Sequence, residues 1–327
     1  MTRAFWLIAG LFVVALAIAA LRLVCGPGEL AWPSDWTIFE LRGHRVVSAA
    51  AVGAALSLSG LLLQVMLRSP VASEYVLGLS AGAGLGIVAA TFVSFRVTGQ
   101  IVSYSPPLLA PVLGAGAALL VVFLLGRRGG LIDPPTLILV GIVVGILASA
   151  VTTLLQHLLP DQGMAVYTRW LMGAISSEAP WPRVWVVSGV AAVGLIVAGW
   201  LGPSMDAAML SDDEARSVGV PLGALRVAIF ALASALTGAT LLISGPLAFV
   251  GLICPHLARL IVGTSHRTLA VASAFIGAAV LLAADAGVTV FTLPSGQLPV
   301  GVVTALIGGP MFVVMLRRGG LFPGGRP

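Results

Sequence analysis

The feature that most constrains this sequence is a series of apolar runs long enough to cross a lipid bilayer as helices. A membrane-spanning helix needs about 20 predominantly apolar residues. Hydrophobic residues make up 59% of the chain and charged residues only 9%, whereas a soluble domain carries about a quarter charged residues. The runs that reach or approach this length are Leu7–Val24, Val46–Leu67, Val76–Phe95, Leu108–Leu125, Leu137–Leu159, Val184–Leu201, Leu222–Ile243, Leu269–Val290 and Val300–Leu316. The sequence therefore predicts an all-α, polytopic membrane protein. Because the loops between runs are short, we expect one transmembrane domain over residues 1–327.

The basic residues are all arginine, since the 17 basic positions include no lysine. A phosphate-binding P-loop requires a lysine that reaches the terminal phosphates, and Schiff-base catalysis requires a lysine amine. The chain itself is therefore not expected to hydrolyse ATP. The arginines are scattered at span ends and do not cluster on one face, which argues against a nucleic-acid partner.

The same arginines predict the orientation of the spans. A tenth apolar run, Phe249–Val262, is too short to cross unaided as a straight helix. If it crosses, with the N-terminus in the cytoplasm, more arginines fall inside than outside, in agreement with the positive-inside rule. The inside set is Arg3, Arg68, Arg127, Arg128, Arg216, Arg226, Arg259, Arg267, Arg317, Arg318 and Arg326, and the outside set is Arg22, Arg42, Arg45, Arg96, Arg169 and Arg183. We predict ten spans, with both termini in the cytoplasm.

The inner loop Gly202–Pro221 contains a pattern typical of a short capped helix. Ser211 followed by Glu214 is a capping-box spacing, and further carboxylates lie at the positive end of the helix dipole. Gly219 can adopt the left-handed conformation that ends a helix, and Pro221 blocks its continuation. We predict a short amphipathic helix on the cytoplasmic face, either a docking element for a cytoplasmic partner or a self-capped surface loop. Its residues are Ser211, Asp212, Asp213, Glu214, Ala215, Arg216 and Gly219.

A second unusual segment is Gly245–Arg259, in which Pro246 and Pro255 flank Gly251. This composition is incompatible with one regular helix, and irregular backbone at membrane depth must be buried in protein or line a cavity. His256 has no second histidine, cysteine or carboxylate nearby in the sequence, so we expect a hydrogen-bonded structural residue and no metal site.

Two further features lie near span ends. Arg42 and Arg45 are three residues apart, so on a helical turn they point the same way and offer two exposed guanidiniums to carboxylates. Alternatively, they anchor the span end at the lipid headgroups.

The small-xxx-small pairs Gly82–Gly86 and Gly141–Gly145 indicate either close helix packing or a moving helix pair.

From Leu41 to about Arg318, the sequence resembles the permease subunits of ATP-binding-cassette importers for iron–siderophores, haem and cobalamin, the FecCD-type or type II importer family. The motifs that carry the resemblance are the Gly245–Arg259 stretch, Trp170-Leu171-Met172-Gly173, Leu77-Gly78 followed by Ser80-Ala81-Gly82-Ala83, Leu298-Pro299-Val300-Gly301-Val302-Val303-Thr304-Ala305, and Gly308-Gly309-Pro310-Met311-Phe312. The chain departs from the family at His44, where proline is usual, at Thr289, and at Ser69 and Val71.

The resemblance implies a transport subunit that is not itself an enzyme and holds no cofactor, together with a set of partners. These are a second permease subunit, identical or not, two cytoplasmic ATPase subunits that bind ATP and Mg, and an extracytoplasmic binding protein, at a bacterial cytoplasmic membrane. It implies coupling helices at about residues 205–221 and salt bridges from Arg42 and Arg45 to glutamates of the binding protein. It also places the translocation path and gate at Ser69, Pro70, Val71, Gly78, Ser80, Gly82, Pro134 and Pro135.

The function we expect is therefore the permease subunit of an importer for an iron–siderophore, with haem or cobalamin as the alternative cargo. A more distant alternative is a secondary transporter driven by an ion gradient. Such a carrier would place ionisable residues inside its spans. Only Asp285 is plausibly within a span, whereas Glu74 and Asp133 lie at span boundaries, which favours the importer.

Overall fold

The computed structural model describes residues 2–26, 29–99, 109–128, 131–160, 167–168, 170–176, 179–291 and 297–317. Arg169, Arg318, Arg326 and parts of the Pro160–Arg183 loop lie outside these residues. The helices are α1 (Thr2–Val24), α2 (Trp36–Met66), α3 (Leu79–Thr98), α4 (Ala110–Leu125), α5 (Pro134–His157), α7 (Trp181–Ala208), α8 (Asp212–Ser217), α9 (Leu222–Thr240), α10 (Val250–Val262), α11 (His266–Val290) and α12 (Val300–Arg317). Two antiparallel pairs of short strands, β1 (Cys25–Gly26) with β2 (Glu29–Leu30) and β3 (Arg127–Arg128) with β4 (Leu131–Ile132), complete the described fold.

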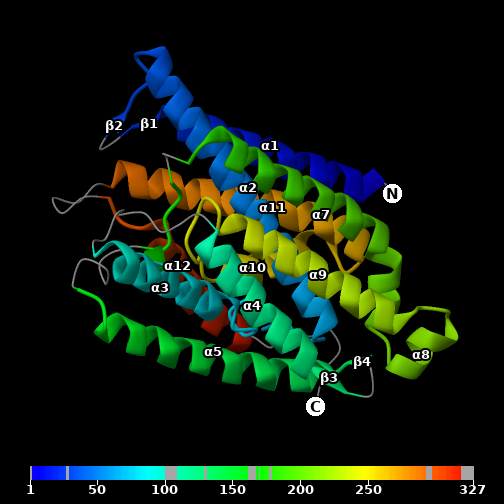
Figure 1. The fold of residues 1–327 in the computed structure, drawn as a ribbon. Coiled ribbons are helices and arrows are strands. Elements are labelled where there is room, and N and C mark those ends of the chain that lie inside the picture. Colours follow the sequence, from blue (N-terminus) through cyan, green and yellow to red (C-terminus); the bar gives the residue numbers. More distant parts are fainter. Residues whose placement is uncertain are drawn as a thin grey trace.

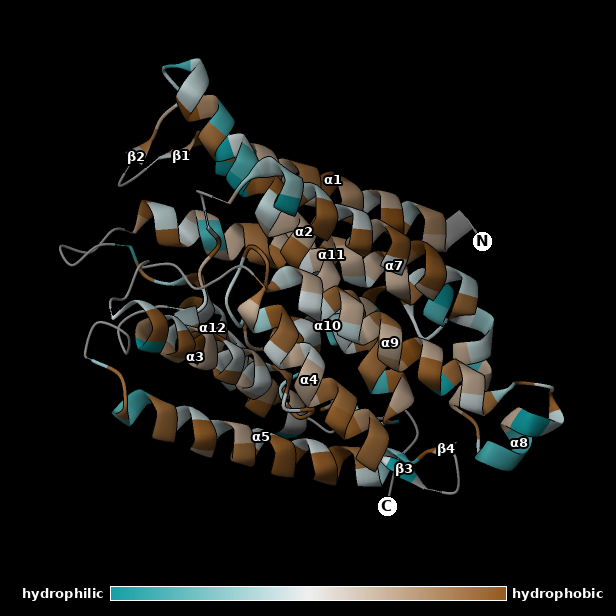
Figure 2. Ribbon diagram, viewed as in Figure 1, coloured by the Kyte–Doolittle hydropathy of each residue, from teal (hydrophilic) through white to brown (hydrophobic). Residues whose placement is uncertain are grey.

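The long helices run roughly alongside one another, so the molecule has two ends (Figure 1). The strands β1 and β2 lie at one end, while α8, β3, β4 and the start of α1 lie at the other. In Figure 2, α8 is strongly hydrophilic, whereas the outward-facing helices α1, α5 and α7 are largely apolar. This distribution fits a bundle whose sides face lipid and whose ends face water.

Seven of the described helices are long and apolar enough to cross a membrane, and three shorter apolar helices are Ala110–Leu125, Val250–Val262 and Val300–Met315. Each of the ten predicted spans overlaps one of these helices. The all-α prediction is confirmed. Ten crossings remain a prediction, because length and composition alone do not show that the shorter helices traverse the bilayer.

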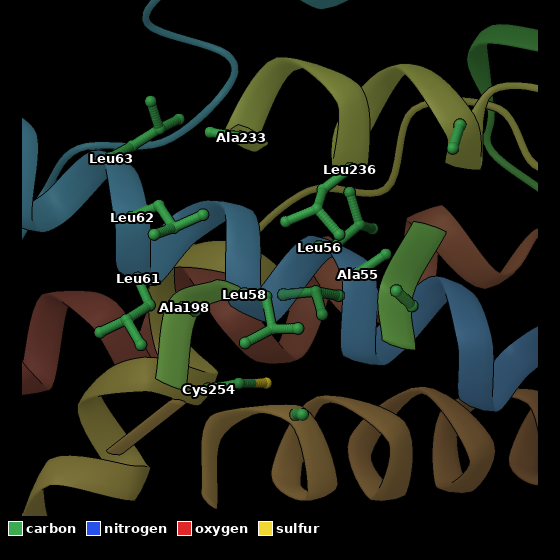
Figure 3. Close-up of a cluster of buried hydrophobic side chains, with 14 of the residues drawn as sticks. Ala55, Leu56, Leu58, Leu61, Leu62, Leu63, Ala198, Ala233, Leu236 and Cys254 are labelled. Carbon is green, nitrogen blue, oxygen red and sulfur yellow. The ribbon is translucent and has the colours of Figure 1, made fainter. Parts of the chain in front are cut away.

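The core is built around α2 and α11. In the most apolar stretch of α2, 78% of the residues are buried, and in that of α11, 72% are buried. In the corresponding stretch of α1, only 6% are buried. The α2 helix contacts α7, α9, α10 and α11, while α3, α4 and α5 pack mainly on one another and reach the rest through α4 and α9. Figure 3 shows the leucines of α2 pointing into this core, including Leu58, Leu61 and Leu62, together with Leu236 of α9 and Cys254 of α10.

Glycine allows the closest helix approach in this core. A Cβ atom on Gly60 of α2 would lie 1.7 Å from the carbonyl oxygen of Gly251 in α10, so no other residue fits there without moving the backbone. The predicted small-residue pairs also lie in tight contacts: Gly82 and Gly86 face α4, and Gly141 faces the segment before α3. The packing interpretation of these pairs therefore accounts for their positions.

Two helix ends differ from the prediction. The α2 helix begins at Trp36, ten residues before the predicted span, so Arg42 and Arg45 lie on the helix itself. The α7 helix runs to Ala208, beyond the apolar run that ends at Leu201, because Met205 and Ala208 are still buried against the bundle. Residues 205–208 of the predicted coupling segment are thus the last turn of α7, and only residues 212–217 form the separate short helix α8.

Candidate functional site

The helix α8 forms as the capping pattern predicts. The Ser211 hydroxyl accepts a hydrogen bond from the Glu214 backbone N–H at 3.3 Å, and the Ser211 N–H donates to the Glu214 carboxylate at 3.0 Å. Both hydrogen bonds of the capping box are therefore present, and the hydrogen bonds from Ser211 lower the pKa of Glu214. Ala215 is buried, while Asp213 and Arg216 are exposed. Gly219 ends the segment with φ +85°, as expected for a left-handed cap.

Asp212, the first residue of α8, contacts two arginines from distant parts of the chain. Its Oδ1 atom lies 2.7 Å from Arg68 Nη2, just after α2, and 2.9 Å from Arg226 Nη2, near the start of α9. Arg226 Nη2 also donates to Oδ2 at 3.0 Å. Burial opposes ionisation of Asp212, but the guanidiniums of Arg226 and Arg68 outweigh it and lower the pKa of the carboxyl. The cluster is therefore a charged pair of arginines bridged by one carboxylate.

Several residues predicted for the gate lie close to this cluster. Ser69 and Pro70 directly follow Arg68 and line a pocket of about 460 Å³, together with Gln64, Arg259 and His266. Val71 is exposed. Pro134 and Pro135 are the first residues of α5, next to Ile132, whose carbonyl oxygen accepts a hydrogen bond from Arg226. The structure thus brings the Ser69–Val71 segment and the start of α5 to the same end of the bundle as α8.

The other predicted path residues lie elsewhere. Gly78 begins α3 with φ +72° and packs on Gly141 and Gly145 of α5. Ser80 follows on the first turn of α3 and is half-buried. Gly82 is buried against Ala118 and Gly114 of α4, a position that fits helix packing rather than the lining of an open path.

A second charged cluster lies at the opposite end of the bundle. Arg22 Nε of α1 lies 2.6 Å from Asp285 Oδ2, and Arg45 Nη2 of α2 lies 2.9 Å from Asp285 Oδ1. Asp285 is fully buried in α11, Arg22 is 2% exposed and Arg45 is 14% exposed. The one ionisable residue expected within a span is therefore paired with two arginines, an arrangement of the kind expected for a buried charge.

This cluster corrects the expectation of two exposed guanidiniums. Arg45 is held by Asp285, and Arg42 donates to the carbonyl oxygens of Leu23 at 2.9 Å and Ala31 at 2.7 Å. The Arg42 side chain ties α2 to the end of α1 and to the segment that follows it, and the Arg45 side chain ties α2 to α11. The prediction was wrong on this point because the spacing of two arginines on a helix does not reveal carbonyl and carboxylate partners distant in sequence.

The Gly245–Arg259 segment is irregular, as predicted. The α9 helix ends at Thr240, α10 begins at Val250, and Phe249 between them has φ +68°. His256 is buried in α10, but its Nδ1 atom has no hydrogen-bond partner among the described residues. The expectation of a hydrogen-bonded histidine is therefore not met at Nδ1. Over the described part of the chain, there is no group of three or more histidine, cysteine or acidic residues that could hold a metal ion.

Glu74, which was predicted to lie at a span boundary, is a buried acid. It is 3% exposed, and its Oε2 atom has no hydrogen-bond partner in the described residues. A Cβ atom on Gly251 would lie 2.8 Å from this oxygen, so the carboxyl packs directly on the irregular start of α10. Nothing in the local sequence signals this burial, because the contact joins segments far apart in the chain.

Comparison with known proteins yields a family match over nearly the whole sequence. The model of the FecCD transport family matches residues 4–318. The vitamin B12 import system permease protein BtuC of Vibrio parahaemolyticus is 36% identical over 314 residues, which cover 93% of this chain and 91% of that protein. BtuC of Escherichia coli O17:K52:H18 is 31% identical over 314 residues, with 94% of each chain covered.

Solved structures agree with this match. A transporter assigned to the metal-chelate type of ABC transporters, captured in an inward-facing conformation, has a TM-score of 0.82 and 28% identity, with 96% of this chain and 99% of that chain covered. PsaBC of Streptococcus pneumoniae, in complex with a Fab, has a TM-score of 0.50 at 12% identity, with 85% of this chain and 95% of that chain covered. The second likeness concerns the fold alone.

Proposed function

This chain belongs to the FecCD transport family and is the permease of an ABC importer, and from that premise we propose that its cargo is a cobalamin. The observation that carries the proposal is the similarity to vitamin B12 permeases, at 36% identity over 93% of the chain. A cobalamin is also a metal chelate, which is compatible with the metal-chelate type of the structural neighbour. The first expectation from sequence, an iron–siderophore, is not confirmed, and the relatives favour the alternative.

The energy source we propose is a separate pair of ATPase subunits. The chain contains no lysine for a P-loop, and its capped, hydrophilic helix α8 projects from one end of the bundle (Figures 1 and 2). We assign this end to the cytoplasm, because Arg68, Arg226 and Arg259 lie there and the positive-inside rule favours that side. The start of α1 lies at the same end, in keeping with a cytoplasmic N-terminus.

The remaining partners follow from the same reasoning. A second permease subunit would complete the path, and α5 offers an apolar surface for it or for lipid, since only 22% of its most apolar stretch is buried. An extracytoplasmic binding protein would deliver the cargo at the end where β1 and β2 lie. Because Arg42 and Arg45 are engaged within the chain, we propose that they shape this docking face instead of forming free salt bridges.

The cargo assignment can be tested on the binding protein that co-purifies with the chain. We expect isothermal titration to show tight binding of cyanocobalamin, and no saturable binding of a ferric siderophore or of haem. Tight binding of the ferric siderophore or haem, with none of cyanocobalamin, would replace the cargo and leave the importer assignment in place. Failure to recover any ATPase or binding protein from a native membrane extract would argue against the whole assembly.

A further inference from the structure

The cluster around Asp212 joins α8 to two of the three segments predicted for the path and gate, Ser69–Val71 and the start of α5. Arg68 and Arg226 share the Asp212 carboxylate, at 2.7 and 2.9 Å. Each arginine also holds a backbone carbonyl: Arg68 Nε donates to Ala208 at the end of α7, and Arg226 Nη1 donates to Ile132 in β4. One carboxylate on α8 is therefore linked to four other parts of the fold.

The positions of the two arginines connect this cluster to the loop after α2 and to the start of α5. Arg68 immediately precedes Ser69 and Pro70, and Ile132 immediately precedes Asp133, whose carboxylate caps α5 by accepting from the Thr136 N–H. A displacement of α8 that carries Asp212 with it must therefore pull on the loop after α2 and on the start of α5. If α8 moved without the arginines, two guanidiniums would be left side by side without their shared counter-ion, which is electrostatically unfavourable.

The backbone of Arg68 supports a functional reason for this contact. The α2 helix ends in a Schellman arrangement, in which the Arg68 N–H donates to Val65 and the Ser69 N–H donates to Gln64. The left-handed position of this motif is usually glycine, but here it is Arg68, with φ +46°. Arg68 and Phe249 are the two non-glycine residues with positive φ in the described ranges. An unfavourable backbone angle held by surrounding contacts is a feature that clusters at switch regions.

We propose that Asp212 is a positioning residue for transport, which transmits the movement of α8 to the Ser69–Val71 segment through Arg68 and to the start of α5 through Arg226. The inference rests on the proposed function, because it assumes that an ATPase subunit moves α8. It goes further by naming the residues that carry the movement inside the permease. The two residues of the capping box, Ser211 and Glu214, instead bond to each other and hold the start of α8 together.

The experiment uses the complex assembled with its co-purifying ATPase and binding-protein subunits in liposomes. Asp212→Asn keeps the shape of the side chain and removes its charge. We expect the uptake of radiolabelled cyanocobalamin per ATP hydrolysed to be reduced about fivefold or more, the lower end of typical coupling free energies. Asp212→Glu should restore most of the uptake. This charge-preserving variant is therefore the matched control for loss of the ion pairs with Arg68 and Arg226.

A second measurement separates transmission from a purely structural role and does not depend on the cargo. Spin labels on the exposed positions Val71 and Val14, the latter on α1 and outside the Asp212 cluster, should change their separation when ATP is added to the wild-type complex, because the Ser69–Val71 segment moves with α8. Asp212→Asn should abolish this change while leaving the separation without ATP unaltered. If the wild-type separation responds to ATP but no cyanocobalamin enters, the cargo assignment fails and the transmission proposal stands.

Arg68→Gly keeps the proposal testable if Asp212→Asn does not assemble. Glycine suits the positive φ of this position, so the fold should tolerate the change, whereas the ion pair is lost. We expect uptake and the ATP-dependent separation change to be lost in this variant too. The proposal is overturned if Arg68→Gly transports as well as wild type, or if Asp212→Asn cannot be distinguished from Asp212→Glu.

Discussion

Arg45 Nη2 of α2 lies 2.9 Å from Asp285 Oδ1 of α11, although 240 residues separate them in the chain. Arg22 of α1 holds the other oxygen of the same carboxylate. The resulting cluster fastens the peripheral helix α1, which has little buried surface of its own, to the two central helices. It also explains why a buried acid in this chain does not indicate an ion-coupled transporter, since its charge is already balanced within the protein.

Removal of the shared carboxylate should therefore destabilise the fold. Asp285→Ala would leave the Arg22 guanidinium buried without a counter-ion, and breaking a buried pair in this way costs about 3–5 kcal/mol. Arg45→Gln is the matched control, because Arg45 is partly accessible to water and Arg22 still pairs with Asp285. Thermal unfolding in detergent should show a much lower midpoint for Asp285→Ala. Equal midpoints for the two variants would contradict this role for the cluster.

The Gly60–Gly251 contact predicts that a single methyl group added at residue 60 lowers the stability of the fold. Gly60→Ala would place a Cβ atom against a backbone carbonyl of α10, and overpacking of this kind costs about 1–3 kcal/mol or more. Gly189→Ala in α7 is the control, since nothing lies within 4 Å of a Cβ atom there, and alanine is the better helix former. We expect Gly60→Ala to lower the unfolding midpoint and Gly189→Ala to preserve or raise it; the reverse order would refute the packing argument.

The end of the α8 segment should depend on the left-handed conformation of Gly219. Gly219→Val would strain a position with φ +85°, because β-branched residues are genuine outliers at positive φ. Gly219→Asn should be tolerated far better, since asparagine visits this region. Co-purification of the ATPase subunits measures the effect: we expect loss with valine and retention with asparagine. Equal recovery with both variants would show that the shape of this turn does not matter for docking.

The charge on Asp212 predicts an acid-shifted titration. Burial opposes its ionisation, but Arg226 and Arg68 lower the pKa, so the carboxyl should titrate below the usual aspartate value of about 3.9. A lowered folded pKa means that the contact contributes stability above the unfolded value and loses it as the pH falls through the folded one. Solid-state NMR of labelled aspartate, with Asp212→Asn to assign the signal, measures the midpoint. A midpoint at or above the usual value would contradict the ion pair.

Local patterns in the sequence predicted the local structure well. The apolar runs predicted the helices, the spacing of Ser211 and Glu214 predicted the cap of α8, and Pro246 with Gly251 predicted the irregular start of α10. These features depend on residues a few positions apart, whose propensities and hydrogen bonds are fixed by the nearby chain. Helix ends were predicted less well at α2 and α7, because polar residues continue both helices beyond their apolar runs.

The contacts that connect the candidate site could not be predicted in the same way. Asp212 meets Arg68 and Arg226, and Asp285 meets Arg22 and Arg45, only after helices distant in sequence have packed together. Each arginine alone looks like an ordinary residue at a span end. A positive φ at Arg68 is likewise invisible in the sequence, since glycine is the residue that normally signals a left-handed turn.

The most direct test of the account is uptake by liposomes that contain the chain together with its ATPase and binding-protein subunits. We predict that radiolabelled cyanocobalamin accumulates inside only when ATP reaches the cytoplasmic face, that a ferric siderophore and haem do not compete for uptake, and that the permease chain alone hydrolyses no ATP. Accumulation without the ATPase subunits under an imposed ion gradient, or hydrolysis of ATP by the isolated chain, would contradict the account.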